Sequence, residues 1–201
     1  MKPELFGALD LIVGASWAVI IIGVAFIFYL QNSHKAHYKW FFPNLLFHLL
    51  FGVLFALAYA VIISEGGDTL AYHDSAYHLT ELFWKNPVDY FQEIFTTPSA
   101  ETITDRFDAD TGYPPSWIYR EPESFLVAKV ISFFSLITFN SYLGLTLICA
   151  AFASLASWRL FVTLRSLTFC PNWVIVLSTM FIPTVAFWCS GISKDTLVLG
   201  A

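Results

Sequence analysis

The chain has 201 residues, of which 57% are hydrophobic, 18% are aromatic and only 12% are charged. A soluble domain carries about 25% charged residues, so this composition excludes an ordinary soluble protein and indicates an integral membrane protein. The net charge of −5 arises mainly from one segment and predicts no nucleic-acid partner. The three cysteines lie in or beside apolar runs without metal-ligand spacing, and we interpret them as small buried hydrophobic residues.

Uncharged apolar runs divide the chain into predicted membrane spans. A helix needs about 20 apolar residues to cross a bilayer, and the runs that approach this length lie at about 11–30, 43–63, 142–158 and 173–189. The first run is too long for the apolar part of a signal peptide and has no clear small-residue cleavage site, so we expect it to remain as an anchor. Residues 196–201 resemble the start of another apolar helix, and we expect the chain to be the N-terminal part of a longer protein.

Segment 125–139 is apolar but short, and Lys129 interrupts it. It is either a short span or a helix at the outer interface, with Lys129 reaching toward water. Loops on the cytoplasmic side are enriched in Lys and Arg. An interfacial helix places Arg159 and Arg165 on the same side as the basic stretch 31–40, so we adopt this interpretation. The N-terminus and loop 64–124 are then on the outer side of the membrane.

Loop 64–124 contains twelve acids and three bases, and its many aromatic residues are atypical of a disordered linker. Asp68 is predicted to N-cap a helix that continues to Lys85, where Asn86-Pro87 ends it. A second short helix is predicted at 87–95, followed by a turn-rich segment at 96–115. The predicted fold is an all-α polytopic transmembrane helical bundle. It forms one membrane domain over 1–201, with one long external loop, 64–124, that carries short interfacial helices.

Asp68 follows Gly66-Gly67 five residues after the second span ends, so we expect it at the membrane surface. A partly desolvated carboxylate at this depth can act as a general base toward a hydroxyl group or contact a metal ion. A purely structural role as a helix cap is the competing interpretation.

Asp74, His78 and Glu81 share one face of the predicted helix, with spacings of four and three residues. A carboxylate and an imidazole one turn apart can relay a proton or bind a divalent cation, so Asp68, Asp74 and His78 form a candidate metal site. The competing interpretation is a solvated face with Asp–His and Glu–Lys pairs. His73 lies on another face and is expected to pack against neighbours.

Two further candidates carry positive charge. Arg120, followed by Glu121, is one of three bases in an acidic loop, and a guanidinium suits a phosphate head group; the alternative is an ion pair with a nearby acid. Lys194 and Asp195 follow the last aromatic run within Ser190-Gly-Ile-Ser-Lys-Asp. An ionisable pair at such a depth is a candidate functional site, although it can also mark the end of a span. We expect this stretch and 64–85 to lie at one surface.

An acidic external loop that opens with Gly66-Gly67-Asp68 resembles that of the GT-C superfamily of integral membrane glycosyltransferases. The resemblance implies a polyprenyl-phosphate-linked sugar as donor and a glycan, lipid or protein as acceptor. It also implies a location in the bacterial cytoplasmic (inner) membrane, with Asp68 as catalytic base or metal contact. Asp74 and His78 would support Asp68, and Glu81, Glu121 and Asp195 would assist. Arg120 and Lys194 would hold the phosphate leaving group.

Stretches 182–195 and Arg120-Glu-Pro-Glu123 are also similar to segments of bacterial envelope-polysaccharide proteins. The second stretch resembles polymerases of the O-antigen (Wzy-like) type, which would depend on arginines more than on Asp68. A non-catalytic scaffold or a transporter subunit is the alternative from another class. A transporter would place charges in mid-membrane, and the predicted spans carry almost none.

Overall fold

The computed structural model describes residues 4–63 and 67–200, the side chains of residues 100 and 101 excepted. Within this part of the chain every regular element is a helix, which confirms the all-α class. The elements are α1 (Ala8–Asn32), η1 (Ala36–Trp40), α2 (Phe41–Leu57), η2 (Ala58–Ile62), α3 (Gly67–Lys85), α4 (Pro87–Phe95), α5 (Ala100–Arg106), α6 (Ser116–Tyr119), α7 (Pro122–Thr138), α8 (Tyr142–Leu167), α9 (Asn172–Thr179), α10 (Pro183–Cys189) and α11 (Lys194–Gly200).

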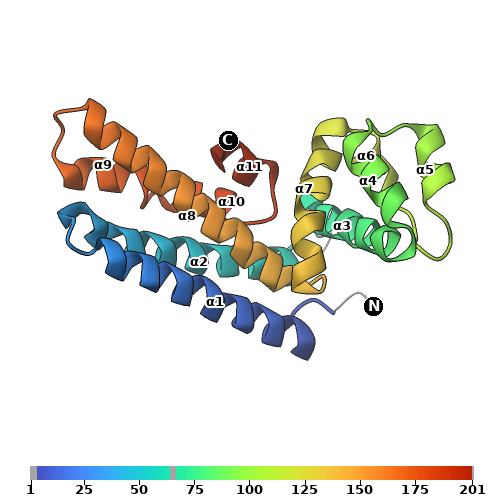
Figure 1. Ribbon diagram of the computed structural model, residues 1–201, viewed down its shortest axis with the longest axis horizontal. Coiled ribbons are helices and arrows are strands. Elements are labelled where there is room, and N and C mark those ends of the chain that lie inside the picture. Colours follow the sequence, from blue (N-terminus) through green and yellow to red (C-terminus); the bar gives the residue numbers. More distant parts are fainter. Residues whose placement is uncertain (1–3, 64–66, 201) are drawn as a thin grey trace.

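Three helical segments are long and apolar enough to cross a membrane: α1, the continuous run Ala36–Ile62 that contains α2, and α8. They lie side by side and contain the predicted spans 11–30, 43–63 and 142–158, apart from the last residue of the second (Figure 1). Helix α8 is the central element, since it contacts both α1 and α2. The connection between α1 and α2 meets the far end of α8, where the His37 ring stacks on Trp158 at 6.0 Å between centroids. The two basic stretches therefore lie at the same end of the bundle.

The predicted fourth span at 173–189 is not one straight helix. It consists of α9 and α10, which are bent by 44° about a break at Met180–Ile182. Pro183 explains the break, because proline has no N–H group to donate and its ring disfavours helical conformation in the preceding residue. After the bend, α10 lies alongside α2. The chain then continues into α11, which packs on α8.

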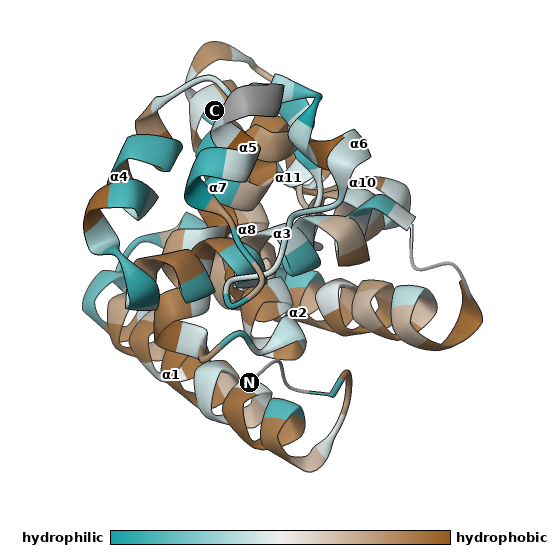
Figure 2. Cartoon of the chain, turned by 90° about the vertical axis from the view of Figure 1, so that its right-hand side faces the viewer, coloured by the Kyte–Doolittle hydropathy of each residue, from teal (hydrophilic) through white to brown (hydrophobic). Residues whose placement is uncertain are grey.

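Helices α3 to α7 form a helical cap, residues 67–138, at the end of the bundle opposite the basic stretches (Figure 1). Seen from the cap, α1 is hydrophobic over nearly its whole length, whereas α4 carries long hydrophilic patches (Figure 2). The helices predicted up to Lys85 and over 87–95 are confirmed as α3 and α4. Helix α5 was not predicted in the turn-rich segment, although Ser99 and Thr102 form a reciprocal capping box at its start.

Two local predictions were wrong. Helix α3 already begins at Gly67, so Asp68 lies within its first turn, where the unpaired N–H groups still favour a carboxylate. Lys129 in α7 does not reach water: its side chain is buried and donates to the Thr96 carbonyl oxygen at 2.6 Å. Burial lowers the pKa of Lys129, and the nearby Glu93 carboxylate opposes that effect. Ser64, Glu65 and Gly66 lie outside the described residues.

Asp10 joins α1 to the start of α8. Its carboxylate is completely buried and accepts hydrogen bonds from the Ser141 hydroxyl at 2.6 Å and from the Leu143 backbone N–H at 3.1 Å. Ser141 is itself the N-cap of α8 and accepts from the Gly144 N–H. The carboxylate thus satisfies donors at a helix N-terminus that is buried away from water.

We expect Asp10→Ala to reduce the free energy of unfolding by about 2 kcal/mol, because it leaves buried donors at the α8 N-terminus without an acceptor. Asp10→Asn retains one acceptor and should have a smaller effect. Thermal unfolding in detergent measures both changes, with Glu4→Ala as the exposed control. An Asp10→Ala protein as stable as the Glu4→Ala protein would contradict this role.

Candidate functional site

A cavity of about 250 Å³ lies where the end of the α2 run, the start of α3 and the segment after α10 meet. Asp68, Lys194 and Asp195 all line it, so the structure brings together the two stretches that the sequence predicted at one surface. The remaining lining residues are Phe55, Tyr59, Thr69, Tyr72, Trp188, Ile192 and Ser193. We call this space the Asp68–Lys194 cavity.

Negative charge predominates around this cavity. The Lys194 ammonium lies 3.9 Å from a Glu121 carboxylate oxygen, which also accepts from the Ser124 hydroxyl at 2.6 Å. Burial raises the pKa of Tyr72, a hydrogen bond with Ser124 opposes the rise, and the negative charges of Asp68, Glu121 and Asp195 add to it. One ammonium group therefore lies among three carboxylates, so the cavity offers carboxylates that can accept a proton and one cation that can contact an anionic group.

An apolar groove of about 370 Å³ adjoins the cavity along α10 and α11. The two spaces share Trp188 and Asp195, so a charged compartment and an apolar one lie on either side of a common wall. The groove is also lined by Thr184, Val185, Cys189, Val198 and Leu199. A molecule with a polar head and an apolar tail fits this pair of compartments better than a wholly polar molecule does.

A buried polar cluster holds the segment that carries Lys194. His48 in α2 is 1% exposed, and its two ring nitrogens lie 2.8 Å from the Ser190 hydroxyl and 3.2 Å from the Ser157 hydroxyl. Asn44, one turn before His48, donates to the Ser154 carbonyl oxygen at 2.7 Å. This cluster was not predicted from the sequence, although Asn44 and His48 are four residues apart in an otherwise apolar run.

Glycines bring the same segment close to its neighbours. A β-carbon on Gly191 would lie 2.1 Å from the Phe55 ring, so the backbone after α10 can approach α2 only without a side chain there. Gly67, which precedes Asp68, has a left-handed φ of 53°, a conformation that favours glycine. The segment that carries Asp68 thus starts at Gly67, and the segment that carries Lys194 starts at Gly191.

Other candidate residues lie elsewhere. The Asp74 and His78 side chains are 3.7 Å apart, as their i, i+4 spacing predicts, but neither lines the cavity with Asp68. The His78 ring also contacts the Thr111 carbonyl oxygen at 2.8 Å. Within the described residues no three His, Cys, Asp or Glu side chains are grouped to hold a metal ion, so the proposed set of Asp68, Asp74 and His78 is not assembled.

The remaining candidates occupy the cap. Arg120 is exposed and does not line the cavity, although the next residue, Glu121, reaches Lys194. Glu81 is half-buried on α3, and Lys85 pairs with Asp108 and Asp110. His73 is buried, contacts the Asn140 carbonyl oxygen at 2.9 Å and packs against the Tyr142 ring, which confirms a packing role.

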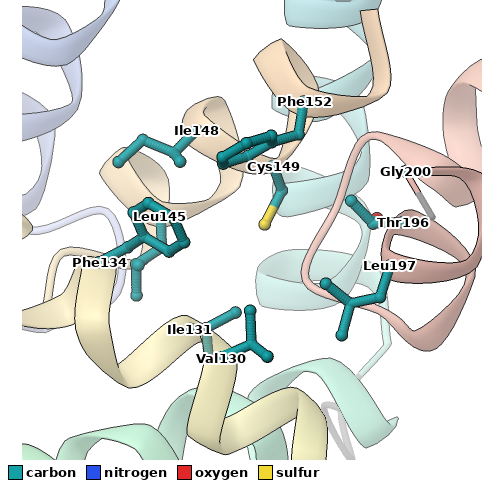
Figure 3. A pocket seen from close by; sticks show the side chains of 10 residues that line it. All are labelled: Val130, Ile131, Phe134, Leu145, Ile148, Cys149, Phe152, Thr196, Leu197 and Gly200. Atoms are coloured by element: carbon teal, nitrogen blue, oxygen red, sulfur yellow. The ribbon is translucent and has the colours of Figure 1, made fainter. Parts of the chain in front are cut away.

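A separate pocket of about 300 Å³ lies between α7, α8 and α11. Its lining is apolar apart from Thr196 and Cys149, whose sulfur atom points into the space (Figure 3). The Thr196 hydroxyl already bonds to the Cys189 and Gly191 carbonyl oxygens. This pocket therefore offers no group for acid–base chemistry comparable to Asp68.

Comparisons of the chain with protein families, with curated proteins and with solved structures find no match. Any functional conclusion consequently rests on the geometry described above.

We expect His48 and Ser190 to stabilise the fold as a pair. His48→Ala leaves two buried hydroxyl groups with one partner fewer, and a double-mutant cycle with Ser190→Ala should give a coupling energy of about 0.5–1.5 kcal/mol. Unfolding in detergent measures the four proteins. The matched cycle of His48→Ala with Ser178→Ala should give no coupling, since Ser178 bonds to Ile175 instead. Equal coupling in both cycles would contradict the contact.

Proposed function

We propose that the protein transfers a sugar from a polyprenyl-phosphate donor to a glycan, lipid or protein acceptor at the Asp68–Lys194 cavity. The observation that carries the proposal is the meeting of a carboxylate-rich cavity with an apolar groove at one end of a bundle of apolar helices. A lipid-linked donor has both parts that such a pair of compartments would hold. The phosphate and the sugar belong beside Lys194 and Asp68, and the chain beside Trp188 and Val198.

In this reaction an acceptor hydroxyl oxygen attacks the anomeric carbon of the sugar, and the bond from that carbon to the phosphate oxygen breaks. Asp68 accepts the hydroxyl proton, since it is the carboxylate at the start of α3 that faces the cavity. The polyprenyl phosphate leaves, and the Lys194 ammonium stabilises the negative charge that develops on it. Glu121, 3.9 Å from Lys194, holds the ammonium in place before the donor binds.

We propose a smaller role for Arg120 in binding the donor phosphate than the sequence indicated. It is exposed and outside the cavity lining, so it would meet a donor only at the entrance. Among the described arginines, Arg106 pairs with the buried Glu93 at 2.5 Å. Arg159 and Arg165 lie in the last part of α8, which meets the α1–α2 connection at the opposite end of the bundle. This distribution does not favour the polymerase alternative, which would need arginines at one site.

The proposed location is the bacterial cytoplasmic membrane, with the cap on its outer side. Three apolar helices long enough to span a bilayer support membrane association. The basic stretches 31–40 and 159–165 lie together at the end away from the cap, and the positive-inside rule favours this end in the cytoplasm.

Asp68→Asn should lower kcat by at least about 100-fold, because an amide cannot accept the acceptor proton. The assay follows release of polyprenyl phosphate from polyprenyl-phosphate hexoses by the protein in liposomes. Asp105→Asn on α5 is the matched control, since it makes the same change at an exposed cap position. Full activity of Asp68→Asn, or no turnover of any donor by the unaltered protein, would contradict the proposal and favour a scaffold.

The proposed orientation predicts which positions react with a membrane-impermeant maleimide in intact cells. Single cysteines at 74 and 194 should be labelled from outside, and those at 35 and 165 should not, in a background without Cys149, Cys170 and Cys189. The same four positions in opened membranes should all react, which serves as the control. Labelling at 35 but not at 194 would reverse the orientation.

A further inference from the structure

A second apolar groove, independent of the proposed sugar transfer, follows the bundle on the side where α1, α2 and α8 meet. It has a volume of about 420 Å³, and its lining includes Trp17, Val24, Phe28, Phe41, Ala151 and Leu155. The groove exists because α1 packs more closely on α8 than on α2. Its one hydroxyl group, on Ser154, is already bonded to the Ala151 carbonyl oxygen at 2.8 Å.

Positive charge lies beyond the groove on both of its flanks, toward the end of the bundle away from the cap. On α8, Arg159 follows Leu155 by four residues and is exposed, so it continues the same helix face by one turn. On α1, Asn32 follows Phe28 by the same spacing, and its side-chain oxygen accepts from the Lys35 ammonium at 2.9 Å. Lys35 also lies 5.3 Å from the centre of the Tyr38 ring, which packs against Phe28 at 6.0 Å.

These two cations have no acidic counterpart nearby. Segments 31–40 and 159–171 contain no Asp or Glu, and neither Lys35 nor Arg159 forms an ion pair within the described parts of the chain. An apolar groove that ends at two unpaired cations is complementary to a ligand with an apolar chain and an anionic head. A basic pocket between membrane helices is the usual form of a site for acidic lipid head groups.

We propose that this groove binds one anionic phospholipid of the surrounding bilayer. One acyl chain lies along Trp17 and Leu155, and the phosphate lies between Lys35 and Arg159. A zwitterionic lipid fits the groove less well, because its choline or ethanolamine group would add a positive charge beside two others. A second copy of the chain fits less well too, since it would bring its own basic end to the same place.

The test uses the full chain in phosphatidylcholine vesicles that contain a small, equal fraction of either phosphatidylglycerol or phosphatidylcholine brominated on its acyl chains. Bromine quenches nearby tryptophan fluorescence, and the difference between the unaltered protein and Trp17→Phe isolates the signal of Trp17. We expect brominated phosphatidylglycerol to occupy the groove about 25-fold more readily than brominated phosphatidylcholine, because each of the two basic side chains contributes about a fivefold preference.

The double substitution Lys35→Gln/Arg159→Gln should reduce this selectivity to nearly one. Lys85→Gln/Arg120→Gln, which removes the same charge from the cap, should leave it unchanged. Ala151→Phe fills the groove and should abolish quenching of Trp17 by both lipids, while unfolding in detergent shows that the fold is retained.

Three results would overturn the proposal. One is equal quenching of the unaltered protein by the two lipids, which indicates ordinary solvation by the bilayer. The second is a loss of selectivity in Lys85→Gln/Arg120→Gln that is as large as the loss in Lys35→Gln/Arg159→Gln. The third is quenching by neither lipid, with a dimer on cross-linking, which indicates that a second copy covers the groove.

Discussion

Most of the bundle depends on the hydrogen bonds that the buried Asp10 carboxylate accepts at the start of α8. Helix α8 contacts α1, α2, α7, α9, α10 and α11, so its position determines where all of them can lie. Its first N–H groups are away from water and need acceptors, and Ser141 and Asp10 provide them. Because Asp10 belongs to α1, the same hydrogen bonds that complete α8 also fix the first helix against it.

The polar cluster around His48 likewise joins helices, because its hydrogen bonds connect α2 to α8 and to Ser190. The break between α9 and α10 turns the chain back toward the cap, and the bond from His48 to Ser190 holds the chain where α10 ends. The segment that follows carries Lys194 and Asp195 to the first turn of α3. The candidate site therefore depends on a proline, a buried histidine and Gly191, none of which faces the cavity.

Much of the fold could be predicted from the sequence, because length and lack of charge suffice to identify helices such as α1 and α8 that are long and apolar enough to cross a bilayer. The proximity of Asp68 and Lys194 was also predicted, since both follow apolar runs that end at one surface. The bend at Met180–Ile182 was missed because the apolar pattern continues through Pro183. Lys129 was placed in water because periodicity along α7 carries no information about Thr96, whose carbonyl oxygen, just after α4, accepts from the Lys129 ammonium.

The candidate site was harder to predict than the fold, because part of it depends on contacts between residues that are far apart in the sequence. Helical spacing brings Asp74 and His78 together, as predicted, and it also separates them from Asp68, which lies six and ten residues earlier on the same helix, α3. Conversely, Glu121 reaches Lys194 across 73 positions of the chain, and only the packing of α7 beside α11 reveals it. Contacts of that kind leave no periodic signal.

The bend between α9 and α10 affects how this segment could insert into a membrane. Helices of 8 and 7 residues are each too short to cross a bilayer, and the break between them exposes backbone groups that hydrocarbon cannot satisfy. Phe181 packs against Phe47, and Phe187 against Phe55, so α2 covers the break and the helix that follows it. Three helical segments are each long and apolar enough to cross a bilayer alone, whereas the bent pair at 172–189 could cross only as one broken span or enter as a re-entrant loop. In a membrane that pair would be buried only after the three-helix assembly had closed around it.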